Sequence, residues 1–230
     1  MSVIIVTGGN GRFAQELKKI KNKNKFIFLD KKKLNILNLN SINKSIKKFK
    51  PKSIIHLAGL SRPMKIHEEN IDKSIRLNII GTCNIVLACK KHNIKLIYLS
   101  TSYVYPGLKG DYKETESLLP WNNYGWSKLG GECAAQMYKN TLIIRACMTE
   151  KPFVHKSAYA NVKSNFIFHN DFIKIFLKVL NKKGIYNIGG KSQSIYEFAK
   201  NNNPAVKKKY SKGEFPLLQN MNLNKIKKFL

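Results

Sequence analysis

Short runs of apolar residues alternate along the chain with stretches in which apolar residues recur every three to four positions. An apolar run that ends at a glycine or a turn is typical of a buried parallel strand, and the longer spacing is typical of one helix face. The predicted strands cover residues 3–7, 25–30, 53–57, 94–100 and 141–145. The predicted helices cover residues 11–20, 41–50, 68–92 (continuous or interrupted) and 122–138. This alternation predicts an α/β fold with a doubly wound parallel sheet and helices on both faces.

A glycine-rich turn, TGGNGRFA at residues 7–14, joins the first predicted strand to the first predicted helix. In a dinucleotide-binding fingerprint, Gly8 would permit the tight turn and Gly11 would let the backbone approach a pyrophosphate at the helix start. The small residue Ala14 would replace the third glycine, which serves close packing of helix and strand. The location between strand and helix predicts a Rossmann-type dinucleotide site, although an ordinary glycine-rich turn has the same composition.

An acidic residue, Asp30, ends the second predicted strand. A carboxylate about 20 positions after the glycines can accept hydrogen bonds from the adenosine ribose, which favours NAD. The neighbouring Lys31–Lys33 and Arg12 favour NADP instead, because they could neutralise a 2′-phosphate. The sequence therefore leaves NADPH and NADH open as the cofactor, and it also allows Asp30 to be a surface residue that begins a turn.

The candidate chemistry lies after the fourth predicted strand, which ends in hydroxyl residues including Thr101. Tyr124 and Lys128 follow at a spacing of four, so both project from one face of a helix. A nearby ammonium favours the phenolate form of a tyrosine, whose pKa is otherwise about 10. Such a phenol can transfer a proton to or from a substrate oxygen, and the Thr101 hydroxyl can hold that oxygen. A Tyr-x-x-x-Lys pair also arises by chance on helix surfaces. Here it indicates a catalytic pair because it follows the glycine turn and the hydroxyl-rich strand end in the chain.

Four motifs in order, TGGNGRFA, HLAG at 56–59, STSYVY at 100–105 and YGWSK at 124–128, resemble the extended short-chain dehydrogenases. These are NAD(P)-dependent nucleotide-sugar epimerases, dehydratases and reductases, and the resemblance runs through about residue 148. The cofactor contacts that it implies are Gly8, Asn10, Gly11, Arg12, Phe13, Asp30, Leu57, Ala58, Gly59, Tyr124 and Lys128. The catalytic set that it implies is Thr101, Tyr124 and Lys128, and the implied substrate contacts are Thr101, Ser102 and Tyr103.

One detail separates the activities within this superfamily. Sugar 4,6-dehydratases carry an Asp-Glu pair directly after the catalytic hydroxyl residue, whereas Thr101 is followed by Ser102 and Tyr103, which argues against dehydration. The ST-x-YV pattern and LNILN at 34–38 resemble the dTDP-4-dehydrorhamnose reductases, in which a nicotinamide reduces the C4 carbonyl of a 4-keto-6-deoxy sugar. Two alternatives stay open: an epimerase that uses bound NAD, and a non-catalytic, regulatory NAD(P)-binding homologue.

The C-terminal part is short for this superfamily. By the resemblance, residues 1–148 form the Rossmann-type, NAD(P)-binding domain that carries the catalytic residues. Residues 149–230 form a small substrate-binding lobe, partly interleaved with the sheet. We expect a strand near 184–190, a helix within 166–180 and a loosely ordered loop over the Lys/Asn-rich residues 201–214. His169 and Asp171 are assigned a structural rather than a catalytic role.

The formal net charge of +29 suggests a polyanionic partner such as nucleic acid. The lysines are scattered, however, and Lys, Asn and Ile codons can be written almost wholly in A and T, so an AT-rich genome also accounts for the bias. We favour that explanation and expect the basic surface to attract an anionic nucleotide substrate. A nucleic-acid-binding protein remains the alternative.

The four cysteines form no Cys-x-x-Cys pair and have no nearby histidine at ligand spacing, so we expect neither a disulfide nor a metal site. No apolar stretch approaches the ~20 residues of a membrane span, and the first residues lack the basic region of a signal peptide. We expect a cytoplasmic protein. Relatives often pair through long helices, which leaves a homodimer open.

Overall fold

The computed structural model describes residues 2–230, and these divide into two compact units. Unit 1 holds the chain up to Ser100 together with residues 123–144 and 182–185. Unit 2 holds residues 101–122, 145–181 and 186–230. The units are therefore interleaved along the chain, and a substrate-binding role for everything after residue 148 stays a prediction.

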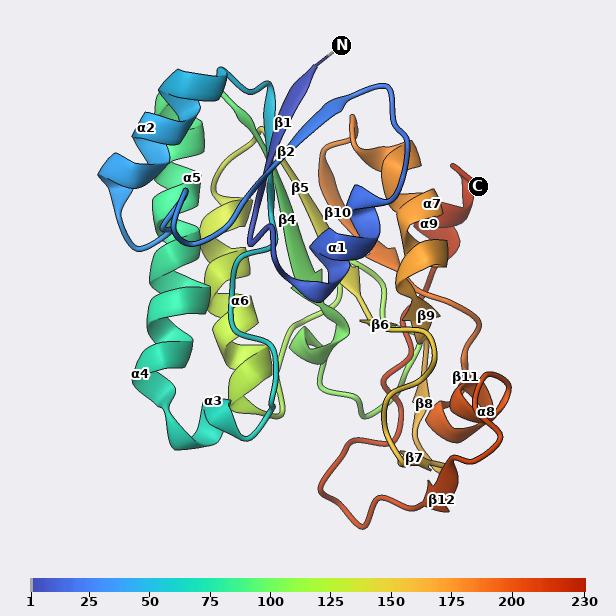
Figure 1. The fold of residues 1–230 in the computed structure, drawn as a ribbon. Coiled ribbons are helices and arrows are strands. Elements are labelled where there is room, and N and C mark those ends of the chain that lie inside the picture. The colour runs from blue at the N-terminus through green and yellow to red at the C-terminus, as the bar shows by residue number, and fades with distance from the viewer. Residues whose placement is uncertain (1) are drawn as a thin grey trace. The chain divides into compact units, whose positions relative to one another are not determined.

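Unit 1 is organised around a six-stranded sheet with the order β10-β5-β4-β3-β1-β2 (Figure 1). Its strands are β1 (Val3–Thr7), β2 (Lys25–Leu29), β3 (Ser53–His56), β4 (Lys95–Thr101), β5 (Thr141–Ala146) and β10 (Gly184–Ile188). β1 pairs in parallel with β2 and β3, and β3 pairs in parallel with β4. All five strands expected before residue 148 are present, and so is the late strand, which confirms the predicted parallel sheet.

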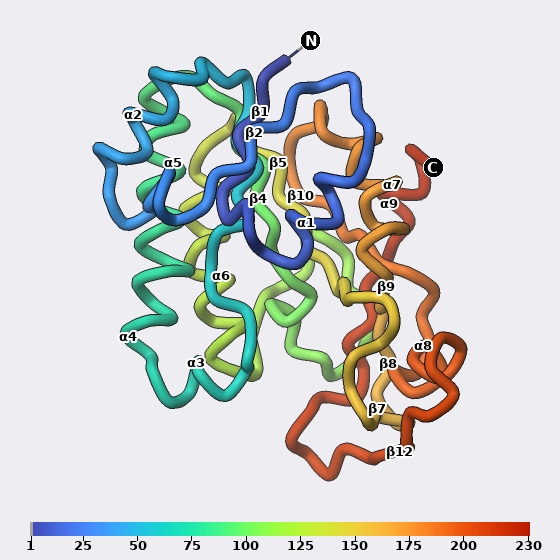
Figure 2. The backbone as a smooth tube through the Cα atoms, viewed as in Figure 1, coloured from blue at the N-terminus to red at the C-terminus, as the bar shows by residue number. Residues whose placement is uncertain are grey.

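The helices of unit 1 lie on both faces of this sheet. They are α1 (Arg12–Lys18), α2 (Leu39–Phe49), α3 (Ile66–Glu69), α4 (Ile71–Ser74), a π-helical segment (Ile75–Ile80), α5 (Gly81–Lys91) and α6 (Asn123–Gln136). In Figures 1 and 2, α2, α5 and α6 cover one face, whereas α1 lies on the other. Helix α5 packs against both α2 and α6, so the helix that carries Tyr124 and Lys128 belongs to a continuous helical layer.

Aliphatic side chains from the sheet and from this helical layer form the core of unit 1. Ile5 of β1 and Ile54 of β3 are fully buried, as are Ile42 of α2 and Ile85 of α5. Burying such a side chain contributes about 1.5–3 kcal/mol. The core therefore fixes α2 and α5 against the sheet, and it does so through the apolar periodicity that predicted these elements.

Unit 2 consists of short elements. They are a 3₁₀ turn (Ser102–Val104), β6 (Met148–Thr149), β7 (Ser157–Tyr159), β8 (Lys163–Ser164), β9 (Ile167–Phe168), α7 (His169–Val179), β11 (Gln193–Ser194), α8 (Ile195–Lys200), β12 (Lys207–Lys209) and α9 (Asn224–Lys227). The strands form two-stranded ladders, β11 with β8, β12 with β7 and β6 with β9. A separate aromatic-rich core includes Phe153, Phe168 and Phe198, so unit 2 has apolar packing of its own.

One expectation needs correction. Residues 201–214 are not all loop, because Lys207–Lys209 form β12 and pair in parallel with β7. That pairing uses backbone groups, and three exposed lysines give no apolar pattern that could reveal it. For the stretch 68–92, which the sequence left as continuous or interrupted, the structure shows the interruption. Asn70 leaves helical geometry (φ −139°, ψ 72°), and its side chain accepts a hydrogen bond from the Lys73 N–H at 2.9 Å, which caps α4.

Candidate functional site

The glycine turn lies where the strand order of the sheet reverses. β1 has β2 on one side and β3 on the other, and ligands of open α/β sheets bind outside the carboxyl ends of strands at such a point. Gly8 follows β1 with φ +67°, and a Cβ there would lie 2.8 Å from the backbone of Ala58. Only glycine allows both the backbone angle and this close approach. The turn is thus packed directly on the loop that follows β3.

Thr7 fastens this loop to the end of β1. Its Oγ1 accepts hydrogen bonds from the N–H groups of Leu57 and Ala58, each at 3.1 Å, and lies 2.9 Å from Nδ1 of His56. Thr7 is fully buried. Because both lone pairs of the hydroxyl are taken by the two N–H groups, its proton points to His56, whose Nδ1 acts as the acceptor.

His56 continues this chain of hydrogen bonds toward the helical layer. Its Nε2 lies 3.2 Å from Oγ1 of Thr82, which itself donates to the carbonyl oxygen of Asn78 at 2.7 Å. Both ends therefore assign the same neutral tautomer, with the proton on Nε2. Burial, followed by the positive charge of Lys128, lowers the pKa of His56 to about 3. The ring is a neutral connector within a buried network.

Asn78 carries the network on to α6. Its Oδ1 accepts from the N–H of Leu60 at 2.7 Å, and its Nδ2 donates to the Leu60 carbonyl at 2.9 Å and to Oγ of Ser127 at 2.8 Å. Ser127 in turn donates to the carbonyl oxygen of Tyr124 at 2.8 Å. A continuous set of buried hydrogen bonds thus connects the glycine turn with the helix turn that bears Tyr124.

Tyr124 and Lys128 stand one turn apart on α6, and both are half-buried. The Tyr124 ring lies 5.0 Å from the ring of His67, and Nζ of Lys128 lies 4.2 Å from the ring centroid of Tyr98. Burial lowers the pKa of Lys128 to about 7, while the negative charge of Glu132 opposes this effect. The ammonium is held against an aromatic face rather than in open solvent.

The first turn of α6 is held by α3. Glu68 accepts hydrogen bonds from the backbone N–H of Asn123 at 3.2 Å and from its Nδ2 at 2.5 Å. A carboxylate at this position satisfies a backbone donor that has no partner within the helix. The residue after Asn123 is Tyr124, so this contact fixes the start of the helix beside the candidate catalytic side chain.

The other expected cofactor residues surround the glycine turn. Asp30 accepts a hydrogen bond from the Lys33 N–H at 3.0 Å, so it does begin a turn, and its second oxygen lies 3.5 Å from Nδ2 of Asn10. Arg12 donates to Oγ of Ser61 at 3.4 Å. The side chain of Phe13 is buried, so only its backbone could contact a pyrophosphate. Gly59 faces Asn78, whose Oδ1 would lie 2.8 Å from an added Cβ.

Three expected substrate residues belong to unit 2. Thr101 ends β4, and its Oγ1 accepts a hydrogen bond from the Tyr103 N–H at 3.3 Å. Ser102 is fully buried, and its Oγ has no partner within residues 2–230. The Tyr103 ring packs against Trp121 and Phe215, with centroids 5.2 and 5.7 Å away. Their contacts with a substrate stay predictions.

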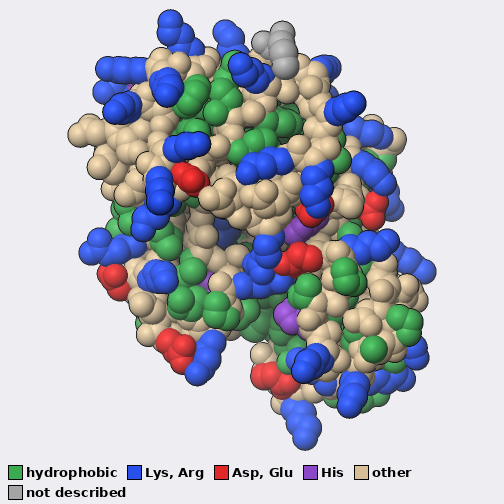
Figure 3. Space-filling view, in the orientation of Figure 1, with side chains coloured by type: hydrophobic (Ala, Val, Ile, Leu, Met, Phe, Trp, Pro, Cys, Tyr) green, Lys and Arg blue, Asp and Glu red, His purple; other side chains and the backbone are tan. Residues whose placement is uncertain are grey.

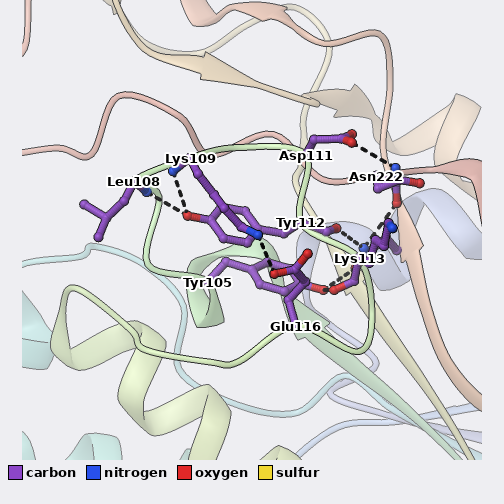
Figure 4. Close-up of polar contacts among 9 residues, drawn as sticks. Tyr105, Leu108, Lys109, Asp111, Tyr112, Lys113, Glu116 and Asn222 are labelled. Atoms are coloured by element: carbon purple, nitrogen blue, oxygen red, sulfur yellow. Dashed lines mark hydrogen bonds and ion pairs between the residues drawn. The ribbon is translucent and has the colours of Figure 1, made fainter.

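The chain that follows Tyr103 forms a closely bonded loop (Figure 4). Tyr105 stacks on Tyr112 with ring centroids 4.9 Å apart, and the Tyr112 hydroxyl accepts from the N–H groups of Leu108 and Lys109 at 2.7 and 3.1 Å. Asn222 donates to Asp111 at 3.0 Å. This loop therefore has an ordered scaffold of its own within unit 2.

Sequence reasoning missed the connecting residues of unit 1: His56, Asn78, Thr82, Ser127 and Glu132. Their signal is a polar residue where the pattern demands an apolar one. His56 ends a buried strand, and Asn78 and Thr82 are spaced by four on one helical face. Glu132 stands four positions after Lys128 and is fully buried. Such positions mark buried hydrogen-bond networks, but the sequence does not tell which partners meet.

Comparison with known proteins decides the family. Residues 1–162 match the family described as the RmlD substrate binding domain. The chain belongs to this family. This membership confirms the resemblance that the four motifs predicted.

Two relatives and one solved structure define what this RmlD-family chain is similar to. A dTDP-4-dehydrorhamnose reductase from Aggregatibacter actinomycetemcomitans is 28% identical over 193 residues, which are 82% of this chain and 60% of that protein. Methionine adenosyltransferase 2 subunit beta from Pongo abelii is 34% identical over 101 residues, 44% of this chain and 30% of that protein. The chain thus spans 60% or less of the length of these relatives.

The solved structure is a dTDP-4-dehydrorhamnose reductase from Bacillus anthracis in complex with NADP. It matches with a TM-score of 0.88 and 24% identity over 100% of this chain and 92% of that chain. This likeness confirms the Rossmann-type α/β fold. Within residues 2–230 of the RmlD-family chain, no helix has the length and apolar character needed to cross a bilayer. The same residues contain no cluster of three or more His, Cys, Asp or Glu side chains suited to a metal.

Proposed function

We propose that this chain is an NAD(P)-dependent oxidoreductase that reduces the C4 carbonyl of a nucleotide-linked 4-keto-6-deoxy sugar. The observation that carries the proposal is the buried network from Thr7 through His56 and Asn78 to Tyr124. It fastens a Tyr–Lys pair to a glycine turn at the switch point of the sheet. Family membership and the names of the reductase relatives support the substrate class.

The residues around the turn fit a dinucleotide. Gly8 and Gly11 present backbone rather than side chains, which lets a pyrophosphate come close. Asp30 and Asn10 lie beside the turn with polar atoms for the adenosine ribose, and Lys128 has an ammonium for the nicotinamide ribose. When bound, the dinucleotide would supply the hydride. The candidate cofactors remain NADPH and NADH, since Asp30 favours NADH and Lys31–Lys33 favour NADPH.

In the proposed reduction, Tyr124 gives its hydroxyl proton to the substrate oxygen as the carbonyl becomes an alcohol. Lys128 stabilises the phenolate that remains, because a positive charge nearby favours the ionised form of a phenol. Thr101, which belongs to unit 2, keeps the substrate contact that the resemblance implies for it. Proton transfer by a positioned side chain typically contributes 10²–10⁴-fold to a rate.

The test is consumption of NADPH, or of NADH, with dTDP-4-keto-6-deoxy sugars as substrates. We expect Tyr124→Phe to lower kcat about 100-fold or more while the affinity for the dinucleotide is kept. Tyr210→Phe is the matched control, because Tyr210 is 60% exposed and we expect it to leave kcat unchanged. Full activity of Tyr124→Phe would refute the proton-donor role. Absence of both dinucleotide binding and turnover in the unaltered chain would refute the proposed function.

A regulatory, non-catalytic role is a second candidate, because one relative is named as the beta subunit of methionine adenosyltransferase 2. Dinucleotide binding without turnover, and a biological activity unaffected by Tyr124→Phe, would favour it over the reductase. An epimerase is distinguished in a different way. It would be purified with tightly bound NAD and would interconvert nucleotide sugars without net consumption of NADPH.

We also propose that two copies pair through α5 and α6. Leu87 on α5 is 55% exposed, and Trp126 and Met137 at α6 are 48% and 86% exposed. Exposed apolar side chains that gather in one patch mark protein–protein interfaces, and α5 and α6 pack against each other. Light scattering should show a dimer that Leu87→Glu converts to a monomer, whereas a monomeric unaltered chain would refute the pairing.

We place the protein in the cytoplasm and expect no nucleic-acid partner. All four cysteines are free, which suits a reducing compartment. On the visible face in Figure 3, Lys and Arg side chains are scattered rather than gathered in one patch. Tight, steeply salt-dependent binding of DNA or RNA would overturn this proposal.

A further inference from the structure

A carboxylate lies fully buried inside unit 1, on the same helix as the Tyr–Lys pair. Glu132 has no exposed surface, although it belongs to α6 and a helix of this kind usually turns acidic residues to solvent. Burying a charged group is costly unless it is hydrogen-bonded and faces an opposite charge. The position therefore demands partners, and the structure provides them.

The first partner is the end of β4. Ser100 donates a hydrogen bond to Oε2 of Glu132 at 2.5 Å, and Gln136 donates to Oε1 at 3.1 Å. Ser100 directly precedes Thr101, the hydroxyl residue proposed to hold the substrate oxygen. One carboxylate thus fastens α6 to the strand end that leads into Thr101.

The second neighbour is Lys128, which stands one helical turn before Glu132 on α6. Burial pulls the pKa of Lys128 down to about 7, and the charge of Glu132 is the opposing influence. Of the other groups near this ammonium, Tyr98 on β4 presents its ring, which attracts a cation, and His56 on β3 is neutral because it is buried. Tyr124 precedes Lys128 on α6, and the other titratable neighbours of Glu132 are Tyr98 and Cys133.

We propose that Glu132 is a positioning residue of the reductase site, which holds Lys128 in the charged form and anchors α6 to the end of β4 through Ser100. The proposal rests on the proposed function, because it assigns Lys128 the task of holding the nicotinamide ribose and stabilising the Tyr124 phenolate. Glu132 has no exposed surface that could contact a substrate or a dinucleotide, so it would act through Lys128.

The test compares two substitutions that separate charge from anchoring. Glu132→Gln removes the charge but keeps an amide that can bond to Ser100, whereas Ser100→Ala removes the hydrogen bond and keeps the charge. The readouts are the dissociation constant for NADPH and kcat/KM, each measured from pH 5.5 to 9. We expect both to worsen in the unaltered protein as the pH rises through about 7, where Lys128 loses its proton.

For Glu132→Gln we expect that midpoint to move down by about one pH unit, the lower end of the effect of a close opposite charge. At pH 7 the protonated fraction of Lys128 then falls about fivefold, while the values at pH 5.5 change little. Ser100→Ala should lower kcat/KM evenly across the range and leave the midpoint in place. Lys128→Arg should remove the alkaline loss, because a guanidinium does not titrate there.

An unshifted midpoint in Glu132→Gln, or an equal shift in Ser100→Ala, would overturn the proposal. NADPH binding at no pH by the unaltered protein would instead overturn the proposed function. A stability measurement tests the Glu132–Lys128 pairing without the cofactor. Lys128→Met combined with Glu132→Gln should unfold at a higher denaturant concentration than the sum of the single changes predicts, and strict additivity would refute the pairing.

Discussion

Adjacent glycines in the middle of α6 give a sharp test of how closely this helix is packed. A Cβ at Gly131 would lie 2.5 Å from the carbonyl oxygen of Asn78, 2.8 Å from the Tyr98 hydroxyl and 3.0 Å from Oγ1 of Thr82. Asn78 and Thr82 belong to the buried hydrogen-bonded network, and the Tyr98 hydroxyl donates to the carbonyl oxygen of Lys128 at 3.0 Å. A Cβ at Gly130 would instead meet the side chain of Ile79 at 2.8 Å, and Ile79 is only half-buried and can turn aside.

The two substitutions should therefore change the free energy of unfolding by different amounts. Alanine gains about 1 kcal/mol over glycine within a helix at either position. At Gly131 this gain opposes an overpacking cost of about 1–3 kcal/mol and the loss of about 1 kcal/mol from a disturbed hydrogen bond between Thr82 and Asn78. We expect Gly131→Ala to be destabilised by about 1–3 kcal/mol. Gly130→Ala should be within about 0.5 kcal/mol of the unaltered protein, or more stable.

Urea unfolding followed by circular dichroism measures both variants against the same baseline. A loss of about 2 kcal/mol corresponds to a Tm lower by roughly 4–8 °C in a domain of this size. Gly131→Ala should also weaken dinucleotide binding, because α6 must move away from Asn78, whereas Gly130→Ala should not. Equal stability of the two variants would refute the reasoning, since it would mean that α6 does not approach the Asn78 backbone as closely as the structure shows.

Four further predictions concern other buried polar groups. Burial lowers the pKa of His56 from 6.5 to about 3, so its stabilising contribution is complete above about pH 6.5 and is lost as the pH falls toward 3, at up to about 1.4 kcal/mol per pH unit. In His56→Gln, the urea midpoint should depend less on pH between about pH 6.5 and 3 than it does in the unaltered protein. An unchanged slope over that range would contradict this prediction. Thr7→Val should cost about 1–3 kcal/mol by leaving two N–H groups without their acceptor. Thr141→Val should be neutral or stabilising, since the buried Thr141 hydroxyl has no partner within residues 2–230. A larger loss of stability in Thr141→Val than in Thr7→Val would contradict the acceptor role of Thr7. Tyr105→Phe should cost about 1–3 kcal/mol in urea unfolding, because its hydroxyl accepts from buried Arg145 at 2.7 Å, and an unchanged midpoint would refute it.

Much of the fold of unit 1 could be predicted because its signals are local. Apolar runs predicted β1, β3 and β4, and the glycine turn lies between a strand and a helix as expected. The signal for the C-terminal end of α2 was also local, because Pro51 cannot continue a helix. In the structure, α2 ends at Phe49 and Lys50 adopts the left-handed region (φ 44°). The short strand β12 could not be predicted, because its three lysines pair through backbone atoms alone.

Local patterns were enough to predict the order of elements along the chain, the glycine turn and the spacing that puts Tyr124 and Lys128 on one helical face. Each of these is a relation among residues a few positions apart. The hydrogen bonds of Thr7 with His56 and of Asn78 with Ser127 depend on the folded arrangement, because each pair is 49 positions apart. Sheet pairing and helix packing bring such groups together, and the low polarity around them makes every hydrogen bond obligatory. For the same reason the role of Glu132 emerged from its burial and its contact with Ser100, which no local pattern encodes.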